Sequence, residues 1–225
     1  MDMRQQILAE ATRLFAARGF DGTSLQDISD AVGIRKPSLL YHFSSKVELR
    51  RGVLERLLAH WQDVLPRLLL AATSGFRRFD AIARELVSFF TENPDRARLL
   101  IREALDRPEE LRESILVHVS PWVKVVCDNI RTGQEQGTIH GDVDPEAYVT
   151  HIIALVISSV ATFDTIGAVI RPQDEADAPA RQQHVRHVTE LLRMARSSLF
   201  VGDRAARPAK QNGSISRASE DGQAR

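Results

Sequence analysis

The sequence predicts an all-α protein of about nine helices, because apolar residues recur every three or four positions along most of the chain before residue 202. Glycines, prolines and capping residues stand between these segments, at positions where helices usually begin and end. No stretch alternates apolar and polar residues over a useful length, as a half-buried β-strand would. These three observations together predict a chain of helices without a β-sheet.

The first helix is predicted from an apolar face and a glycine stop. Ile7, Leu8, Ala11, Leu14 and Phe15 have the spacing of one helical face, and the following RGF segment supplies the stop.

A short second helix follows, with either Thr23 or Ser24 as its cap, because each precedes a polar residue by three positions, which is the capping-box spacing. Its inward face is predicted to hold Leu25, Ile28 and Val32. Gly33 can adopt the left-handed conformation that ends a helix.

A third short helix is predicted to begin near Pro37, since proline fits the first turn of a helix, where its missing N–H costs nothing. This helix is expected to end by Phe43. Ser45 and Glu48 then have the spacing of another capping box, so a fourth helix is predicted to begin near Lys46.

The rest of the chain predicts longer helices. They are expected at residues 47–70 with a bend at Pro66, 76–91, 94–104, 108 to 133 or 137 with a kink at Pro121, 145–166 and 181–200. The segment RPQDEADAPA is predicted to be a polar linker. Residues 202–225 are rich in Ala, Ser and Arg with almost no apolar side chains, so we expect a disordered tail.

The composition limits the classes of function that the chain can have. It contains 30 Lys and Arg and 30 Asp and Glu, so a nucleic-acid partner must be inferred from local features. The single cysteine, Cys127, excludes an internal disulfide and a cysteine-based zinc site, and we expect it to be a small core residue. The longest apolar run, HIIALVISSVATF, is shorter than a membrane span, and MDMRQQ lacks the order of a signal peptide. We therefore expect a cytoplasmic protein without membrane contact.

Two short helices that are joined by a glycine-containing turn and preceded by a longer helix are typical of a helix-turn-helix. In that motif, one face of the second helix stays free to enter the major groove of DNA. Lys36, Pro37 and Ser38 contribute little to a core, whereas Leu39 and Phe43 can anchor the opposite face. The spacing alone fits a DNA-reading unit and an ordinary corner of an all-α protein equally well.

Residues 7–49 closely resemble the DNA-binding region of TetR-family transcriptional regulators. The matching residues are Ala11, Leu14, Phe15, Gly19, Phe20, Thr23, Ser24, Ile28, Ser29, Gly33, Ile34, Leu39, His42, Phe43, Ser45 and Lys46. The resemblance implies a bacterial, ligand-responsive transcriptional regulator, most simply a repressor that leaves a palindromic operator when a small molecule binds. It also implies a helix-turn-helix domain at 1–46, a larger helical domain for effector binding and dimerisation at 47–201, and the tail at 202–225.

Two residues depart from the family pattern. Arg35 stands where the family usually has Ser or Thr, so a side-chain cap is lost and a cation is added near the DNA. Leu40 stands where the family most often has Tyr. It would either contact a thymine methyl group or pack against the second helix.

The resemblance assigns candidate contacts with double-stranded DNA residue by residue. We expect Gln26, Lys36, Pro37 and Ser38 to face base edges, and Arg35 to lie near the DNA. The candidates for phosphate contacts are Thr23, Ser24, Tyr41, His42 and Lys46. Thr23 and Ser24 are equally candidates for helix capping, and Lys46 could be an ordinary solvated lysine.

A homodimer is implied as well, because helix-turn-helix proteins commonly read two half-sites with two-fold symmetry. The predicted interface is formed by the last two long helices, at about 145–166 and 181–200. The segment YVTHIIALVISSVATF is apolar nearly all round, and Ser158, Ser159 and Ala161 would permit close helix approach. The alternative is that this segment is the buried central helix of a monomer.

The larger domain is expected to bind a small-molecule effector in an apolar cavity oriented by a few polar groups. The candidate lining residues are Leu86, Phe90, Ile101, Arg102, His118, Trp122, Val126 and His151. Each of these taken singly fits a purely structural role. The mechanism that we expect is a tilt of the helix that begins near Lys46, which would change the spacing of the two DNA-reading heads.

No enzyme, cofactor or metal site is predicted. The sequence has no phosphate-cradling glycine loop, no zinc-ligand spacing and no setting for a nucleophile. His184 and His187 are three residues apart, but they have no neighbouring carboxylate or thiolate and fit a solvated helix face. A third hypothesis is a protein-interaction module whose helix-turn-helix no longer binds DNA, which Leu40 would slightly favour.

Overall fold

The computed structural model describes residues 2–71, 74–167, 169 and 180–202. These residues form helices, and within the described ranges the only β-type pairing is an isolated bridge between Ile139 and Phe200. The predicted all-α class is therefore confirmed. The predicted linker overlaps residues 170–179, and the predicted tail falls almost wholly on residues 203–225; both segments lie outside the described residues.

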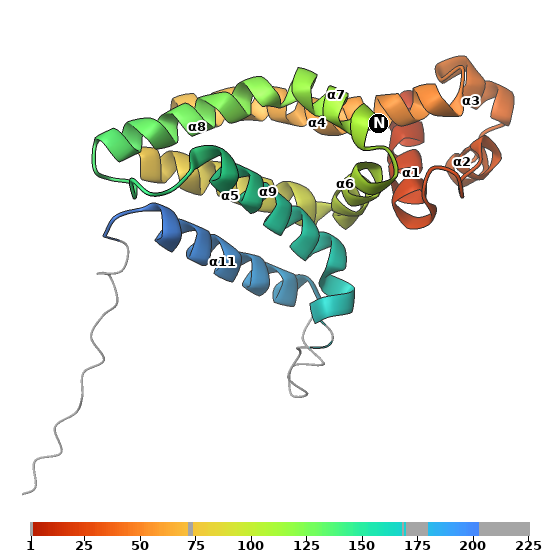
Figure 1. Cartoon of the computed structure of the whole chain (residues 1–225). Helices are drawn as coiled ribbons and strands as arrows, with labels where there is room; N and C mark the ends of the chain where they lie inside the picture. Colours follow the sequence, from red (N-terminus) through yellow and green to blue (C-terminus); the bar gives the residue numbers. More distant parts are fainter. Residues whose placement is uncertain (1, 72–73, 168, 170–179, 203–225) are drawn as a thin grey trace, which may run out of the picture.

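Helices α1 (Met3–Arg18), α2 (Leu25–Val32) and α3 (Lys36–His42) form one end of the molecule, which we call the head (Figure 1). The carboxylate of Asp2 caps α1 by accepting a hydrogen bond of 2.7 Å from the backbone N–H of Gln5. The predicted apolar face of α1 is buried. Gly19 ends the helix with a φ of +77°, in the region that favours glycine.

Helix α2 begins with the predicted capping box, and the capping residue is Ser24. The Ser24 hydroxyl accepts from the backbone N–H of Asp27 at 3.0 Å, and the Asp27 carboxylate accepts from the backbone N–H of Ser24 at 2.7 Å. The Ser24 hydroxyl also donates to the Asp27 carboxylate at 2.5 Å. This bond, together with the one from the Ser24 backbone N–H, holds the pKa of the Asp27 carboxyl below its ordinary value. Gly33 ends α2 in the left-handed conformation, with a φ of +78°.

Helix α3 ends before Phe43, as predicted, because α4 (Lys46–Ala71) has its own cap directly after it. The hydroxyl of Ser45 accepts from the backbone N–H of Glu48 at 3.1 Å. The expected reciprocal bond differs, however: the Glu48 carboxylate accepts from the backbone N–H of Ser44 at 2.7 Å. The cap is therefore shared between two serines.

The remaining helices form the body. They are α5 (Gly75–Glu92), α6 (Pro94–Asp106), α7 (Pro108–His118), α8 (Ser120–Glu135), α9 (Pro145–Thr162), a π-helical turn η1 (Phe163–Gly167) and α11 (Ala180–Leu199). The prediction of one kinked helix after Pro108 is wrong. The chain forms α7 and α8 with a break at Val119, because Pro121 has no N–H with which to continue the hydrogen-bond ladder of α7.

One continuous core joins head and body. It includes Phe15 and Leu39 in the head, Leu49 in the first turn of α4, and Phe90 and Leu99 in the body. Helix α4 runs from the head into the body alongside α7 and α8, while α5, α9 and α11 form the other side (Figure 1). Helix α6 is central, since it packs against α1 and against α9. A smaller cluster of Ile130, Ile139, Leu199 and Phe200 lies away from this main core.

Candidate nucleic-acid interface and effector site

The first turn of α3 faces outward. Lys36, Pro37 and Ser38 are all exposed, and Tyr41 one turn later is 88 % exposed. On the opposite face Leu39 is fully buried, and Phe43 just after the helix is buried too. Burial of these two apolar side chains therefore presents the polar and basic ones to solvent, as a helix that enters a DNA groove requires.

The end of the head carries a connected exposed surface, which we call the reading surface. Its members are Ser24, Gln26, Arg35, Lys36, Pro37, Ser38 and Tyr41, all exposed. The Gln26 side-chain amide donates to the Asp30 carboxylate at 2.7 Å, which orients it along α2. Arg35 precedes α3 and makes no side-chain capping bond, as the sequence predicted, so its guanidinium adds charge without closing the helix.

Two of the predicted phosphate contacts, His42 and Lys46, lie at the margin of this surface and are half-buried. The His42 ring packs edge-on against the Tyr41 ring, with 5.4 Å between their centroids. The Lys46 ammonium lies 4.2 Å from the centroid of the Phe20 ring, a cation–π contact within the head. Lys46 is therefore not an ordinary solvated lysine.

Thr23 is the exception among the ten predicted DNA contacts, because its side chain is inside the protein. It is 1 % exposed, and its hydroxyl donates to the backbone carbonyl of Gly19 at 2.9 Å. It does not cap α2 either, since Ser24 does so. The hydroxyl instead ties the turn after α1 to that helix, which places it away from the reading surface.

Leu40 is 37 % exposed, so packing against α2 does not remove it from solvent. Part of its side chain remains accessible next to Tyr41, at the position where the family more often has a tyrosine. This placement leaves an apolar contact with a DNA base open to Leu40 and gives no support to a fully internal role.

The eight predicted effector contacts differ in burial and in the residues they pack against. Leu86 and Phe90 are buried in the main core, with Trp122 packed beside it, whereas Val126 packs against the smaller cluster. Ile101 is half-buried and His151 is exposed.

The two other polar candidates have backbone partners. Arg102 donates from Nε to the carbonyl of Ala16 at 2.8 Å and from Nη2 to that of Ala17 at 3.2 Å, so it is attached to the last turn of α1. His118 is half-buried, with Nδ1 2.9 Å from the carbonyl oxygen of Ser114. Neither side chain is held free to orient a ligand.

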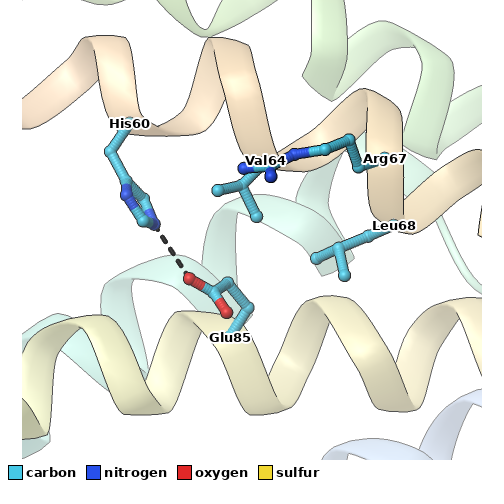
Figure 2. A pocket seen from close by; sticks show the side chains of 5 residues that line it. All are labelled: His60, Val64, Arg67, Leu68 and Glu85. Carbon is cyan, nitrogen blue, oxygen red and sulfur yellow. Dashed lines mark hydrogen bonds and ion pairs between the residues drawn. The ribbon is translucent and has the colours of Figure 1, made fainter.

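A groove of about 410 Å³ opens between α4 and α5, lined by His60, Val64, Arg67, Leu68 and Glu85 (Figure 2). Its volume falls within the range of small-molecule sites. His60 Nε2 and Glu85 Oε1 are 2.9 Å apart and join the two helices across the groove, while Val64 and Leu68 supply apolar surface. The His60 ring stacks on Phe89, with 4.4 Å between centroids.

None of the five groove residues was among the predicted effector contacts. The polar groove residues His60, Arg67 and Glu85 lie next to the apolar face of their helices, and charged side chains at such positions ordinarily face solvent. No local pattern in the sequence points to these residues. Only the pairing across two helices distinguishes these residues from a solvated face.

Helix α9 leaves much of its apolar surface uncovered. Leu155 of α9 is 50 % exposed and Ile166 in the following turn η1 is 56 % exposed, whereas Val156 and Val160 of α9 are buried. The alternative of a buried central helix is therefore wrong for the single chain. By length and composition alone, Pro145–Ile166 could cross a membrane, which the count of uninterrupted apolar residues did not predict. Met194 of α11 is also exposed, so both helices of the predicted dimer interface present apolar side chains.

Comparison with known protein families finds two matches. Residues 7–53 match the family described as bacterial regulatory proteins, tetR family. Residues 77–192, more than half of the chain, match the family described as tetracyclin repressor-like, C-terminal domain.

Individual proteins agree with these matches. The negative regulator IcaR of the biofilm operon icaADBC of Staphylococcus epidermidis is 32 % identical over 117 residues, covering 52 % of this chain and 61 % of that protein, so the chain spans less than two thirds of this relative. The repressor DhaR of a Mycobacterium species is 27 % identical, covering 84 % of this chain and 92 % of the other. The structure of the ketosteroid transcriptional regulator KstR2 of Mycobacterium tuberculosis superposes with a TM-score of 0.67 at 20 % identity, covering 89 % and 96 % of the two chains.

Proposed function

The chain belongs to the tetR family of bacterial regulatory proteins, and from this premise we propose that it is a ligand-responsive transcriptional repressor. In this proposal the protein binds a palindromic operator as a cytoplasmic homodimer, and a small molecule bound in the body releases it. No catalytic step is part of the function.

The observation that carries the proposal is the orientation of α3. Lys36, Pro37 and Ser38 are exposed together while Leu39 is fully buried, which is the arrangement needed to insert the start of a recognition helix into a major groove. Lys36 and Gln26 are suited to the edges of guanine and adenine respectively. Ser24, Arg35, Tyr41, His42 and Lys46 would contact phosphates and fix the register.

The exposed apolar side chains of α9 and α11 support the dimer. A second copy of the chain that packed its own α9 and α11 against them would remove this surface from water and form a two-fold interface. Two heads would then be presented to half-sites that are about 34–36 Å apart.

The groove between α4 and α5 supports control by an effector. Helix α4 begins in the head and carries His60 and Val64, so a molecule seated between α4 and α5 acts on the same rigid element that holds the head. A ligand that separates His60 from Glu85 would shift α4 and change the distance between the two heads. Near-complete release requires a ligand that prefers the non-binding state by about 5 kcal/mol. That the eight residues named from the sequence line an effector cavity stays a prediction.

Selection of duplexes from a random pool, followed by affinity measurements over a range of salt concentrations, tests the proposal. We expect a palindromic sequence to be enriched, with an affinity that falls steeply with salt. Transcription from a promoter that carries this sequence should decrease when the protein is added. A chain that folds and dimerises but enriches no duplex would contradict DNA reading, and increased transcription would contradict repression.

A further inference from the structure

Helix α6 joins four separate parts of the molecule through charged side chains on or directly after it. Arg98 pairs with Asp164 in η1 at 2.7 Å, and Glu103 pairs with Arg50 in α4. Arg102 donates to the carbonyls that end α1. Arg107 pairs with Asp21 in the turn after α1 at 3.2 Å. A single helix therefore connects the end of the proposed dimer helix α9 with the head.

The Arg50–Glu103 pair is the buried member of this set. Arg50 is 4 % exposed and Glu103 is 3 % exposed. Nε of Arg50 donates to both carboxylate oxygens of Glu103, at 2.8 and 3.1 Å, and Nη2 lies 2.7 Å from Oε2 as an ion pair without hydrogen-bond geometry. Nη1 pairs with Glu110 of α7. Burial by itself would lower the pKa of the guanidinium, but the hydrogen bonds with Glu103 and Glu110 raise that pKa overall, so Arg50 stays charged.

A buried ion pair adds little net stability, because desolvation offsets most of the attraction. What it does impose is geometry, since moving the start of α4 away from α6 would leave the buried carboxylate of Glu103 without its partner. Arg50 lies one turn after the start of α4, directly below the head. The pair therefore favours one arrangement of the head on α6. Arrangements that differ by a small shift are less stable, because they separate the two charges.

Three cations contact the turn after α1. The Phe20 ring has the Lys46 ammonium 4.2 Å, the Arg107 guanidinium 4.5 Å and the Arg50 guanidinium 5.5 Å from its centroid. Arg102 supplies donors to the carbonyls at the end of α1, where a helix leaves them unpaired and favours positive charge. The head thus rests on α4, α6 and the segment that follows α6.

We infer that Arg50 and Glu103 are positioning residues that set the half-site spacing this protein accepts, although neither touches DNA. The inference rests on the proposed reading of DNA by a dimer and goes beyond it. Helix α9 packs against α6, and the buried pair fastens α6 to the start of α4, directly after the head, so the distance and angle between two heads are fixed by this joint. Loosening the joint lets each head move without changing any residue on the reading surface.

The test compares operators whose half-sites are moved apart or together by single base pairs. Each step displaces a half-site by about 3.4 Å and rotates it by about 35° around the DNA axis. We expect the wild-type protein to lose about tenfold or more in affinity per step, because either the dimer or the DNA must deform. Glu103→Gln should lose less than about threefold per step, and its affinity for a duplex with one half-site should match wild type.

Glu109→Gln is the matched control, because Glu109 forms an ion pair of 3.3 Å with Arg112 on the exposed surface of α7. This variant should keep the wild-type spacing profile. If Glu103→Gln does not fold, the double variant Arg50→Met, Glu103→Leu removes both charges and fills the site with apolar side chains of similar size. A folded Glu103 variant or double variant with the narrow wild-type profile would overturn the inference.

Hydrogen exchange separates this inference from the proposed function, since it needs no DNA. Loss of the buried pair should raise the exchange of amides in α1 and α2 at least about tenfold relative to α8, because the head opens independently of the body. Unchanged exchange in the head overturns the joint even if the protein binds DNA. If loss of the pair speeds exchange in the head but the wild-type protein enriches no duplex, the role of the pair as a joint is supported and only the DNA-binding proposal is rejected.

Discussion

Replacement of Lys36 by alanine tests the reading surface at one of its exposed cations. Lys36 is the first residue of α3 and lies beside Pro37 and Ser38, all of them in solvent. Alanine is the best helix former, so α3 should persist in the variant. The substitution therefore removes a charge and a set of hydrogen-bond donors from the proposed DNA contact without removing any core side chain.

The size of the effect follows from the contact that Lys36 makes. A lysine that reads a guanine edge is worth about 1–3 kcal/mol per half-site, so a two-fold dimer loses about 2–6 kcal/mol, which is about 30-fold to 20,000-fold in affinity. A lysine that contacts only phosphate would weaken binding to all sequences alike. In that case the slope of log affinity against log salt would fall by about 0.9 per half-site, or about 1.8 per dimer.

Fluorescence anisotropy with the selected operator and with single-base variants, at several salt concentrations, separates these outcomes. Lys124→Ala is the matched control, since it removes the same charge from an exposed position on α8, a helix of the body. The control should bind like wild type. If folded Lys36→Ala binds with unchanged affinity, sequence preference and salt slope, then the first turn of α3 does not enter DNA, and the argument from its exposure is refuted.

Four further outcomes follow from the head and from α9. Leu39→Ala should destabilise the head by about 2–5 kcal/mol, visible as lost amide protection in α3 with the body retained, because Leu39 is fully buried; full protection would contradict its anchoring role. Ser24→Ala should destabilise α2 by about 1 kcal/mol in chemical unfolding, and equal stability would mean that the cap is dispensable. Ser24 lowers the pKa of the Asp27 carboxyl in the folded protein. The stability that this cap contributes is therefore complete at a pH above 3.8, the ordinary pKa, and is lost as the pH falls through the lower pKa of the folded state. Amide protection of α2, measured against pH, should drop only below pH 3.8. Leu155→Glu should give a monomer in sedimentation, since it places a charge on the exposed apolar face of α9, and a stable dimer would place the interface elsewhere.

The head could be predicted almost completely because the interactions that define it are short in sequence. A capping box spans three residues, a glycine stop acts on the preceding turn, and an apolar face repeats within four positions. Ser24, Gly33 and the buried face of α3 were all identified in this way. The capping pattern left Thr23 and Ser24 as alternatives, because adjacent hydroxyl residues are equivalent in it, and only packing of the turn against α1 distinguished them.

By itself, the sequence determined the helical class, the limits of most helices and the outward-facing residues of α3, since each depends on neighbours within about one helical turn. The tertiary structure alone decided what joins helices that are distant in the chain. Arg50 and Glu103 are 53 residues apart, and Arg102 meets α1 across 86 residues; neither pairing has a local signal. The groove at His60 and Glu85 arises in the same way, because an imidazole and a carboxylate meet across a helix interface only once apolar packing has set the rotation of both helices.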